Sequence, residues 1–213
     1  MAAREYGQYC GVTRAVELVG ERWALLIVRD LLVGPRRYGE LAAGLPRIPS
    51  NILAARLKEL QAAGVIRRIP RLRVVVYELT PYGRELEPVV LALGAWGLQH
   101  LDEPRPEQIV TPASMAITLR TAFRPLVAAG LPATTYGARF DDAPLRVRVD
   151  ASGLDLSRKD GPVDLLLEAS PGIHRLVAGD LAPAAALASG AVGILAGPDA
   201  LLARFAETFR LAA

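Results

Sequence analysis

The segment from residue 45 to residue 80 constrains the fold of this chain most, because it places an amphipathic helix directly before two β-rich runs. It reads LPRIPSNILAARLKELQAAGVIRRIPRLRVVVYELT. Pro49 and Ser50 are typical of a helix start, and Gly64 is typical of the residue that follows a helix end. The pattern therefore predicts a helix over 51–63.

Two runs rich in β-branched residues follow this helix, at 65–69 and 74–79. They predict a hairpin with its tip at 70–73. Four arginines lie within seven residues around that tip: Arg67, Arg68, Arg71 and Arg73. A helix beside a basic hairpin suits duplex DNA, because the major groove admits a helix and the adjacent phosphates attract arginine.

A helical wheel divides the predicted helix into two faces. At about 100° per residue, Leu53, Leu57 and Leu60 share one side, which we expect to face the core. The opposite side is small and polar, and small side chains let a helix approach base edges closely. There Asn51 can pair with adenine, and Lys58 can reach a phosphate or a guanine. An ordinary solvated helix face is the alternative.

The candidate DNA-binding residues combine this face with the neighbouring basic residues. Arg56 lies nearer the core boundary, so it suits an intramolecular brace or a phosphate contact. About six phosphate contacts per monomer predict that log K falls against log salt concentration with a slope of about −5. The full set is Arg36, Arg37, Ser50, Asn51, Ala54, Ala55, Arg56, Lys58, Arg71 and Arg73.

Charge is distributed unevenly along the chain. Residues 1–100 hold 14 Lys and Arg against 9 Asp and Glu, whereas residues 101–213 hold 11 against 13. This asymmetry predicts two modules with different partners. The single cysteine and the absence of a signal-peptide pattern predict a cytoplasmic protein. An uncharged run at 181–198 is broken by Pro and Gly, so we expect no membrane span.

Helices are also predicted over 12–19, 23–33 and 38–44, and a longer one over 81–101. Thr80 is expected to cap the longer helix, with Pro81 at its first position. Its apolar positions form a stripe that either packs on its own domain or forms a dimer interface. The stripe comprises Leu86, Val89, Leu93 and Trp96, and His100 is a candidate extension of it.

The sequence predicts an α+β chain with two domains. Residues 1–101 form the first, 102–112 form a proline-rich linker, and 113–213 form the second. In the second, the expected elements are a helix over 113–129, strands over 134–140, 145–149, 154–156 and 163–169, a helix over 182–189, a strand over 192–196 and a helix over 198–211.

The first hundred residues resemble a known family. The segments CGVTRAVELVGERWALLIVRDLLVGPRRYGEL, IPSNILAARLKELQAAGVIRR and VVYELTPYGRELEPVVLALGAWG are similar to the HxlR group of bacterial winged-helix regulators, which are related to the MarR group. The resemblance covers residues 7–101. It implies a winged helix-turn-helix domain and a homodimer that binds a pseudo-palindromic operator, with recognition helices about 34 Å apart.

The resemblance also implies roles for two further sets of residues. The N-terminal segment and the long helix would form the dimer interface, through Tyr9, Val12, Leu86, Val89, Val90, Leu93 and Trp96. Cys10 matches a position where some relatives carry a redox-sensing thiol, and a helix start would favour its thiolate. The alternative for Cys10 is a small buried residue in a helix seam. Unchanged release of DNA by peroxide in a Cys10→Ser variant would exclude the sensor.

The closing segment IHRLVAGDLAPAAALASGAVGILAGPDALLARFAETF resembles the end of sterol-carrier-protein-type domains, in which a strand, a short helix, a strand and a final helix cover an apolar cavity. This resemblance implies an α/β layered domain with a pocket for an apolar small molecule. Plain core packing is the alternative role for the residues that would line it. They are Met115, Leu119, Phe123, Leu126, Phe205 and Phe209.

Neither a catalytic set nor a metal-ligand pattern is evident. The two histidines, His100 and His174, lack metal-ligand spacing, and no serine has a nucleophile context. We therefore expect no enzyme activity, no cofactor and no metal. The favoured function is a homodimeric DNA-binding transcriptional regulator controlled by an apolar effector. The alternatives are a hydrophobic-ligand carrier whose winged helix mediates protein contacts, and an enzyme that uses the second domain.

Overall fold

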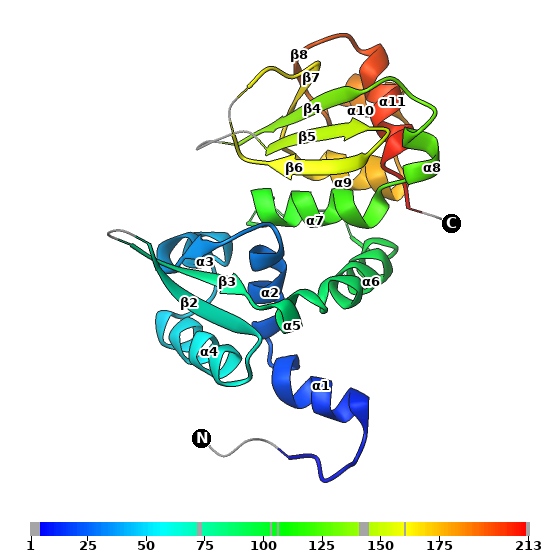
Figure 1. Ribbon diagram of the computed structural model, residues 1–213. Helices are drawn as coiled ribbons and strands as arrows, with labels where there is room; N and C mark the ends of the chain where they lie inside the picture. The colour runs from blue at the N-terminus through cyan, green and yellow to red at the C-terminus, as the bar shows by residue number, and fades with distance from the viewer. Residues whose placement is uncertain are drawn as a thin grey trace. The chain divides into compact units, whose positions relative to one another are not determined.

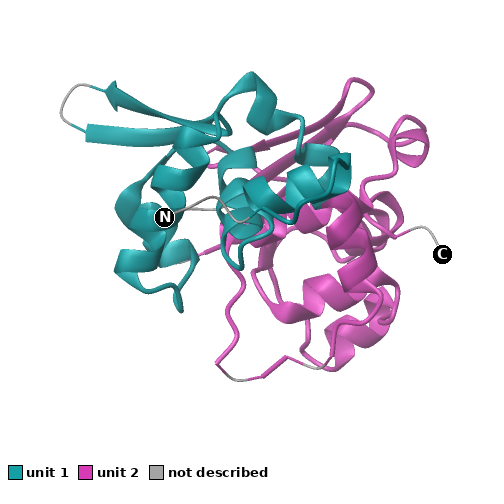
Figure 2. Ribbon diagram, turned by 90° about the horizontal axis from the view of Figure 1, so that it is seen from below, with its two compact units in different colours: residues 1–90 teal, residues 91–213 magenta. Residues whose placement is uncertain are grey.

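The computed structural model describes residues 5–71, 74–102, 104–105, 107–140, 145–159 and 161–211. The chain forms two compact units, residues 1–90 and 91–213, which are coloured separately in Figure 2. Both helices and sheets occur in each part of the chain, which confirms a mixed α+β protein. The expected division with a linker at 102–112 remains a prediction.

The first unit is a helical cluster with a small antiparallel sheet (Figure 1). The sheet has the order β1-β3-β2, and β2 and β3 form a hairpin in which Arg71 is paired with Val74. Its elements are α1 (Gly11–Val19), α2 (Ala24–Leu32), β1 (Arg36–Arg37), α3 (Tyr38–Gly44), α4 (Ser50–Ala62), β2 (Ile66–Arg71), β3 (Val74–Leu79) and α5 (Pro81–Arg84). This order is that of a winged helix-turn-helix domain, with α3 and α4 as the helix pair and β2–β3 as the wing.

Gly64 ends α4 and starts the wing. Its φ is +71°, a left-handed conformation that suits glycine. The amide of Gly64 donates to the carbonyl of Gln61 at 3.0 Å, and that of Val65 donates to the carbonyl of Leu60 at 2.9 Å. This pair of bonds satisfies carbonyls that the helix end leaves without partners. The chain therefore turns directly from the helix into β2.

The base of the wing is fastened by Thr80. Its hydroxyl donates to the carbonyl of Gly64 at 2.6 Å and accepts from the amide of Gly83 at 3.0 Å, so it caps α5 as predicted. Gly83 lies so close to Val65 that an added Cβ would be 2.0 Å from the Val65 carbonyl oxygen. The junction between wing and α5 therefore requires glycine at this position.

The second unit contains a five-stranded mixed sheet with the order β6-β5-β4-β7-β8, in which only the β4–β7 pair is parallel. Its strands are β4 (Thr134–Arg139), β5 (Leu145–Asp150), β6 (Gly153–Ser157), β7 (Leu165–Glu168) and β8 (Ile194–Ala196). Its helices are α7 (Pro112–Ala122), α8 (Pro125–Ala128), α9 (Pro171–Ala178), α10 (Pro183–Ala188) and α11 (Ala200–Thr208), while α6 (Glu87–Leu98) crosses the boundary between the units.

The core of the second unit lies between one face of its sheet and the helices α9, α10 and α11 (Figure 1). Alternation along β5 buries Leu145, Val147 and Val149, as its sequence predicts. Tyr136 of β4 meets the ring of Phe205 on α11 edge-on, with 5.2 Å between ring centroids. Aromatic packing therefore joins the sheet to the last helix.

Several predicted elements differ from the structure. The helix predicted over 81–101 is two helices, α5 and α6, and the one predicted over 113–129 is α7 and α8. Ser50 is inside α4 and Pro49 is the N-cap, so Ser50 does not cap the helix with its side chain. β2 extends to residue 71, which shortens the predicted tip.

Two elements were absent from the prediction. β1 is only two residues long and pairs with β3, a pairing between distant segments that local patterns do not reveal. α9 begins at Pro171, the first helical position, where proline is favourable. It includes the segment IHRLVA, which the sterol-carrier resemblance had assigned to a strand.

No helix among the described residues has the length and apolar character needed to cross a membrane.

Candidate nucleic-acid interface

Helix α4 separates a buried leucine face from an exposed polar face, as the wheel predicts. Leu53, Leu57 and Leu60 are at most 2% exposed. On the other side, Ser50, Asn51, Ala54 and Lys58 are exposed, and Ala55 is half-buried. The α4 backbone is therefore held on the first unit's core, while most of its polar face is exposed.

Arg56 is part of the fold's own ion-pair network. Its side chain is 12% exposed and lies 3.4 Å from Glu21 and 2.5 Å from Glu59. Glu21 precedes α2, so the Glu21–Arg56 pair joins α4 to the segment between α1 and α2. These contacts agree with the intramolecular brace that its wheel position suggested, and its phosphate contact remains a prediction.

The N-terminal ends of α3 and α4 are linked by one hydrogen bond. The Tyr38 hydroxyl donates to the carbonyl of Ser50 at 2.9 Å. At the start of α3, the Arg37 amide donates to the Glu40 carboxylate at 2.6 Å, and Arg37 is exposed. Sequence reasoning did not select Tyr38, although its position at a helix start beside two arginines could have indicated it.

The described wing arginines are exposed, and two of them pair with a buried carboxylate. Glu78 lies on β3 with its side chain 11% exposed. It accepts from Arg67 at 2.7 Å and lies 3.6 Å from Arg71. Both arginine side chains remain more than half exposed, and Arg68 is exposed as well. Arg73 lies outside the described residues.

Arg36, in β1, is half-buried, and its positive charge acts on the carboxylate of Asp30. Asp30, a carboxylate on α2, is 2% exposed and paired with Arg29 at 2.7 Å. Burial raises the pKa of Asp30, and the guanidinium groups of Arg29 and Arg36 oppose that rise. The sequence pattern did not indicate this buried carboxylate.

The predicted dimer residues are mostly exposed apolar side chains. Tyr9, Val12, Val89, Leu93 and Trp96 are exposed, and Trp96 is 69% exposed. Leu86 is half-buried and Val90 is buried. The role of these residues in a dimer interface remains a prediction.

Cys10 is exposed in the single chain and is the N-cap residue of α1. Hydrogen bonds with Thr13 and Val12 at the first turn lower the pKa of the Cys10 thiol. A lowered pKa favours the reactive thiolate. Its role as a redox sensor remains a prediction.

The six residues proposed to line an apolar pocket are brought together only in part. Met115, Leu119, Phe205 and Phe209 are fully or almost fully buried. Phe209 contacts Phe205 with 4.9 Å between ring centroids and Phe123 with 5.9 Å. Leu126, however, is 91% exposed and does not belong to this cluster.

Comparison with known proteins shows which family the first part of the chain matches. Residues 18–105 match the model of the HxlR-like helix-turn-helix family. The uncharacterized HTH-type transcriptional regulator Rv3095 of Mycobacterium tuberculosis is 44% identical over 99 residues, which are 45% of this chain and 61% of that protein. The chain thus spans less than two thirds of that relative's length.

Two further proteins are similar over the same part. The uncharacterized HTH-type transcriptional regulator YvaP of Bacillus subtilis is 38% identical over 92 residues, which are 42% of this chain and 85% of that protein. The structure of the reduced form of the transcriptional regulator YodB from B. subtilis is 34% identical over 46% of this chain and 100% of that chain, with a TM-score of 0.39.

Proposed function

Because this chain belongs to the HxlR-like helix-turn-helix family, we propose that it is a transcriptional regulator that binds duplex DNA as a homodimer. Helix α4 enters the major groove, and the wing and the start of α3 contact the flanking phosphates. The observation that carries this proposal is the exposed small and polar face of α4, set on a buried leucine stripe beside exposed arginines.

The contacts are proposed to divide into two kinds. Asn51 and the small residues Ala54 and Ala55 face base edges, where close approach permits an Asn–adenine pair. Lys58, Arg37 and the wing arginines contact phosphates, which position the protein without reading sequence. The preference for one operator sequence therefore depends on the few residues that face base edges, whereas the overall affinity for DNA depends on the larger set that contacts phosphates.

The salt dependence of DNA binding tests this function. Titration of the full chain with an operator-containing duplex, selected from a random library, is expected to give a slope of log K against log salt of about −5 per monomer. Fluorescence anisotropy at several salt concentrations measures it. A slope near zero, or no sequence preference in the selected pool, would contradict DNA binding by these residues.

The homodimer is proposed to form through exposed apolar residues of α6 and of the N-terminal segment, each of which presents large side chains to solvent. Val89, Leu93 and Trp96 are exposed along α6. A two-fold dimer would place two copies of α4 about 34 Å apart, matching successive major grooves.

Introducing charge on this surface is expected to separate the protomers. The double variant Leu93→Glu/Trp96→Glu should sediment as a monomer at micromolar concentration, because burying unpaired carboxylates in an apolar interface is unfavourable. Leu126→Glu is the matched control, since Leu126 is even more exposed but lies outside the proposed interface. Sedimentation velocity of both proteins provides the measurement. A double variant that sediments like the wild type would place the interface elsewhere.

The second unit is proposed as a sterol-carrier-like domain that senses an apolar effector. Its mixed sheet, with helices α9 to α11 on one face, supports the layered arrangement. An effector that binds one arrangement of the dimer more tightly would increase the fraction of dimers in that arrangement, and so change the affinity for the operator. The aromatic cluster around Phe209 fills the region proposed as the pocket, so an occupant would have to displace packed rings. The stability of a Phe209→Ala variant tests how tightly these rings pack.

A further inference from the structure

The wing contains a buried carboxylate, that of Glu78 on β3. The residue is 8% exposed and lies directly across the hairpin from Arg67, its partner in the β2–β3 register. Nε of Arg67 donates to the Oε1 atom of Glu78 at 2.7 Å, and Nη2 of Arg67 lies 2.5 Å from the same oxygen. Charge-assisted contacts of this length are among the stronger ones between side chains.

Burial makes this ion pair difficult to open. A carboxylate that is removed from water is unfavourable unless it keeps its partner, so Glu78 holds Arg67 more firmly than an exposed carboxylate would. Arg71 lies 3.6 Å from the second oxygen, Oε2, which is beyond the usual hydrogen-bond distance. Arg71 therefore cannot replace both contacts of Arg67 without moving.

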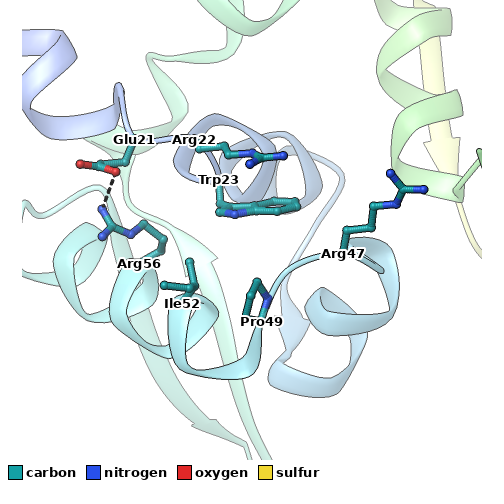
Figure 3. Close-up of a pocket in the computed structure, with 7 residues that line it drawn as sticks. All are labelled: Glu21, Arg22, Trp23, Arg47, Pro49, Ile52 and Arg56. Atoms are coloured by element: carbon teal, nitrogen blue, oxygen red, sulfur yellow. Dashed lines mark ion pairs between the residues drawn. The ribbon is translucent and has the colours of Figure 1, made fainter.

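The basic side chains around the proposed interface fall into two groups. Arg68 on β2 and Lys58 on α4 are exposed, and neither forms an ion pair within the described part of the chain. Arg56, by contrast, lines a pocket beside α4 and pairs there with Glu21, as Figure 3 shows. Arg67 belongs with Arg56, because a carboxylate of the same unit already balances its charge.

A DNA phosphate must compete with Glu78 for the guanidinium of Arg67. The phosphate gains its contact only if the buried carboxylate loses its partner, and these two effects oppose each other. An arginine without such a partner neutralises one phosphate and changes the slope of log K against log salt by about 0.9. Glu78 is therefore expected to remove about one phosphate contact from the wing.

We propose that Glu78 limits the affinity of the wing for duplex DNA by keeping Arg67 away from phosphates. This inference rests on the proposed DNA-binding function and narrows it, because Arg67 leaves the set of wing arginines that contact phosphates. Phosphate contacts carry no base sequence information, so Glu78 lowers the affinity for the operator and for other duplexes to the same extent. Glu78 is thus a positioning residue that acts through Arg67.

Glu78→Gln is expected to tighten DNA binding, a gain that a damaged fold would not produce. The full chain with this change should bind operator and random duplexes about eightfold more tightly at ~0.1 M salt, with a slope steeper by about 0.9. Glu85→Gln is the matched control, because Glu85 is exposed outside the wing and its loss should change affinity less than about twofold. Fluorescence anisotropy measures both variants. Unchanged or weaker binding by Glu78→Gln, or an equal gain in both variants, would overturn the proposal.

A double variant tests whether the effect passes through Arg67. Glu78→Gln/Arg67→Gln removes both members of the ion pair, so its DNA affinity and salt slope should equal those of the wild type. A double variant that binds about eightfold more weakly than the wild type would show that Arg67 already contacts a phosphate, contrary to the proposal. A double variant that keeps the gain of Glu78→Gln would show that Glu78 repels DNA without involving Arg67, which also overturns the proposal.

Chromatography on heparin separates this inference from the proposed function. Heparin is a sulfated polyanion, so its binding reports accessible positive charge without any reading of bases. Glu78→Gln should elute at a higher salt concentration than both the wild type and Glu85→Gln. If this order holds while the wild type binds no duplex, only the proposed function fails. If the wild type binds its operator but Glu78→Gln matches it in elution and in DNA affinity, only the proposal about Glu78 fails.

Discussion

Replacing Lys58, Arg68 and Arg71 together with glutamine is expected to weaken binding to duplex DNA by about 10²–10³-fold per protomer at ~0.1 M salt. All three side chains are exposed, one on α4 and two on the wing, so their loss should leave the fold intact. Each lost phosphate contact should also reduce the salt slope by about 0.9. Anisotropy titrations at four or more salt concentrations measure both quantities.

A matched triple variant separates these contacts from general charge. Arg124, Arg139 and Arg210 are exposed arginines of the second unit, and changing them to glutamine removes the same total charge. We expect their loss to change DNA affinity only slightly and to leave the salt slope unaltered. If both triple variants lost affinity equally, long-range charge rather than a defined interface would account for binding.

Asn51 distinguishes base contacts from phosphate contacts within the same experiment. Asn51→Ala should leave the salt slope unchanged, because it removes no charge. It should lower the preference for the selected operator over random DNA by about 1–3 kcal/mol, the usual value of a good side chain–base pair. An Asn51→Ala protein with an unchanged preference would remove Asn51 from the base-reading set.

The second large effect is expected in the core of the second unit. Phe209 is fully buried and contacts three other rings: Phe123, Tyr136 and Phe205. Phe209→Ala should lower the free energy of unfolding by about 3–5 kcal/mol, through lost burial and the cavity left behind. Urea denaturation of the full chain, together with hydrogen exchange of the β4 and α11 amides, measures this loss.

Leu126→Ala is the control for that variant, because both residues were predicted to line the same apolar pocket. Leu126 is 91% exposed, so its truncation should change stability by no more than about 0.5 kcal/mol. A Phe209→Ala loss below about 1 kcal/mol would show that the cluster is loosely packed. That outcome would favour an open cavity and the apolar-effector proposal.

The winged helix-turn-helix part was largely predictable, because its helices carry strong periodicity and clear end signals. The buried triad of Leu53, Leu57 and Leu60 followed directly from 3.6-residue spacing. The wing followed from β-branched runs after Gly64, and the Thr80–Pro81 cap from its residue types. These features depend on neighbours in sequence, which is why a single sequence was sufficient.

The second unit was less predictable. The helix α9 was missed although Ser170 and Pro171 mark its start, because its eight residues lie between β-like runs and IHRLVA had been assigned to a strand by resemblance. The parallel pairing of β4 with β7 joins segments about thirty residues apart, which local patterns do not specify. Phe205, Phe209 and Leu126 looked alike as apolar residues, yet two are core and one is on the surface.

The sequence by itself determined the recognition-helix faces, the wing and the asymmetry of charge, because these arise from the spacing and type of neighbouring residues. Only the tertiary structure decided which carboxylates form ion pairs with the arginines: Glu21 and Glu59 with Arg56, and Glu78 with Arg67 and Arg71. It also decided that Arg22, Arg47 and Trp23 line one pocket. Ion pairs and cavities form between segments that are distant in the chain, so their partners are set by packing rather than by local pattern.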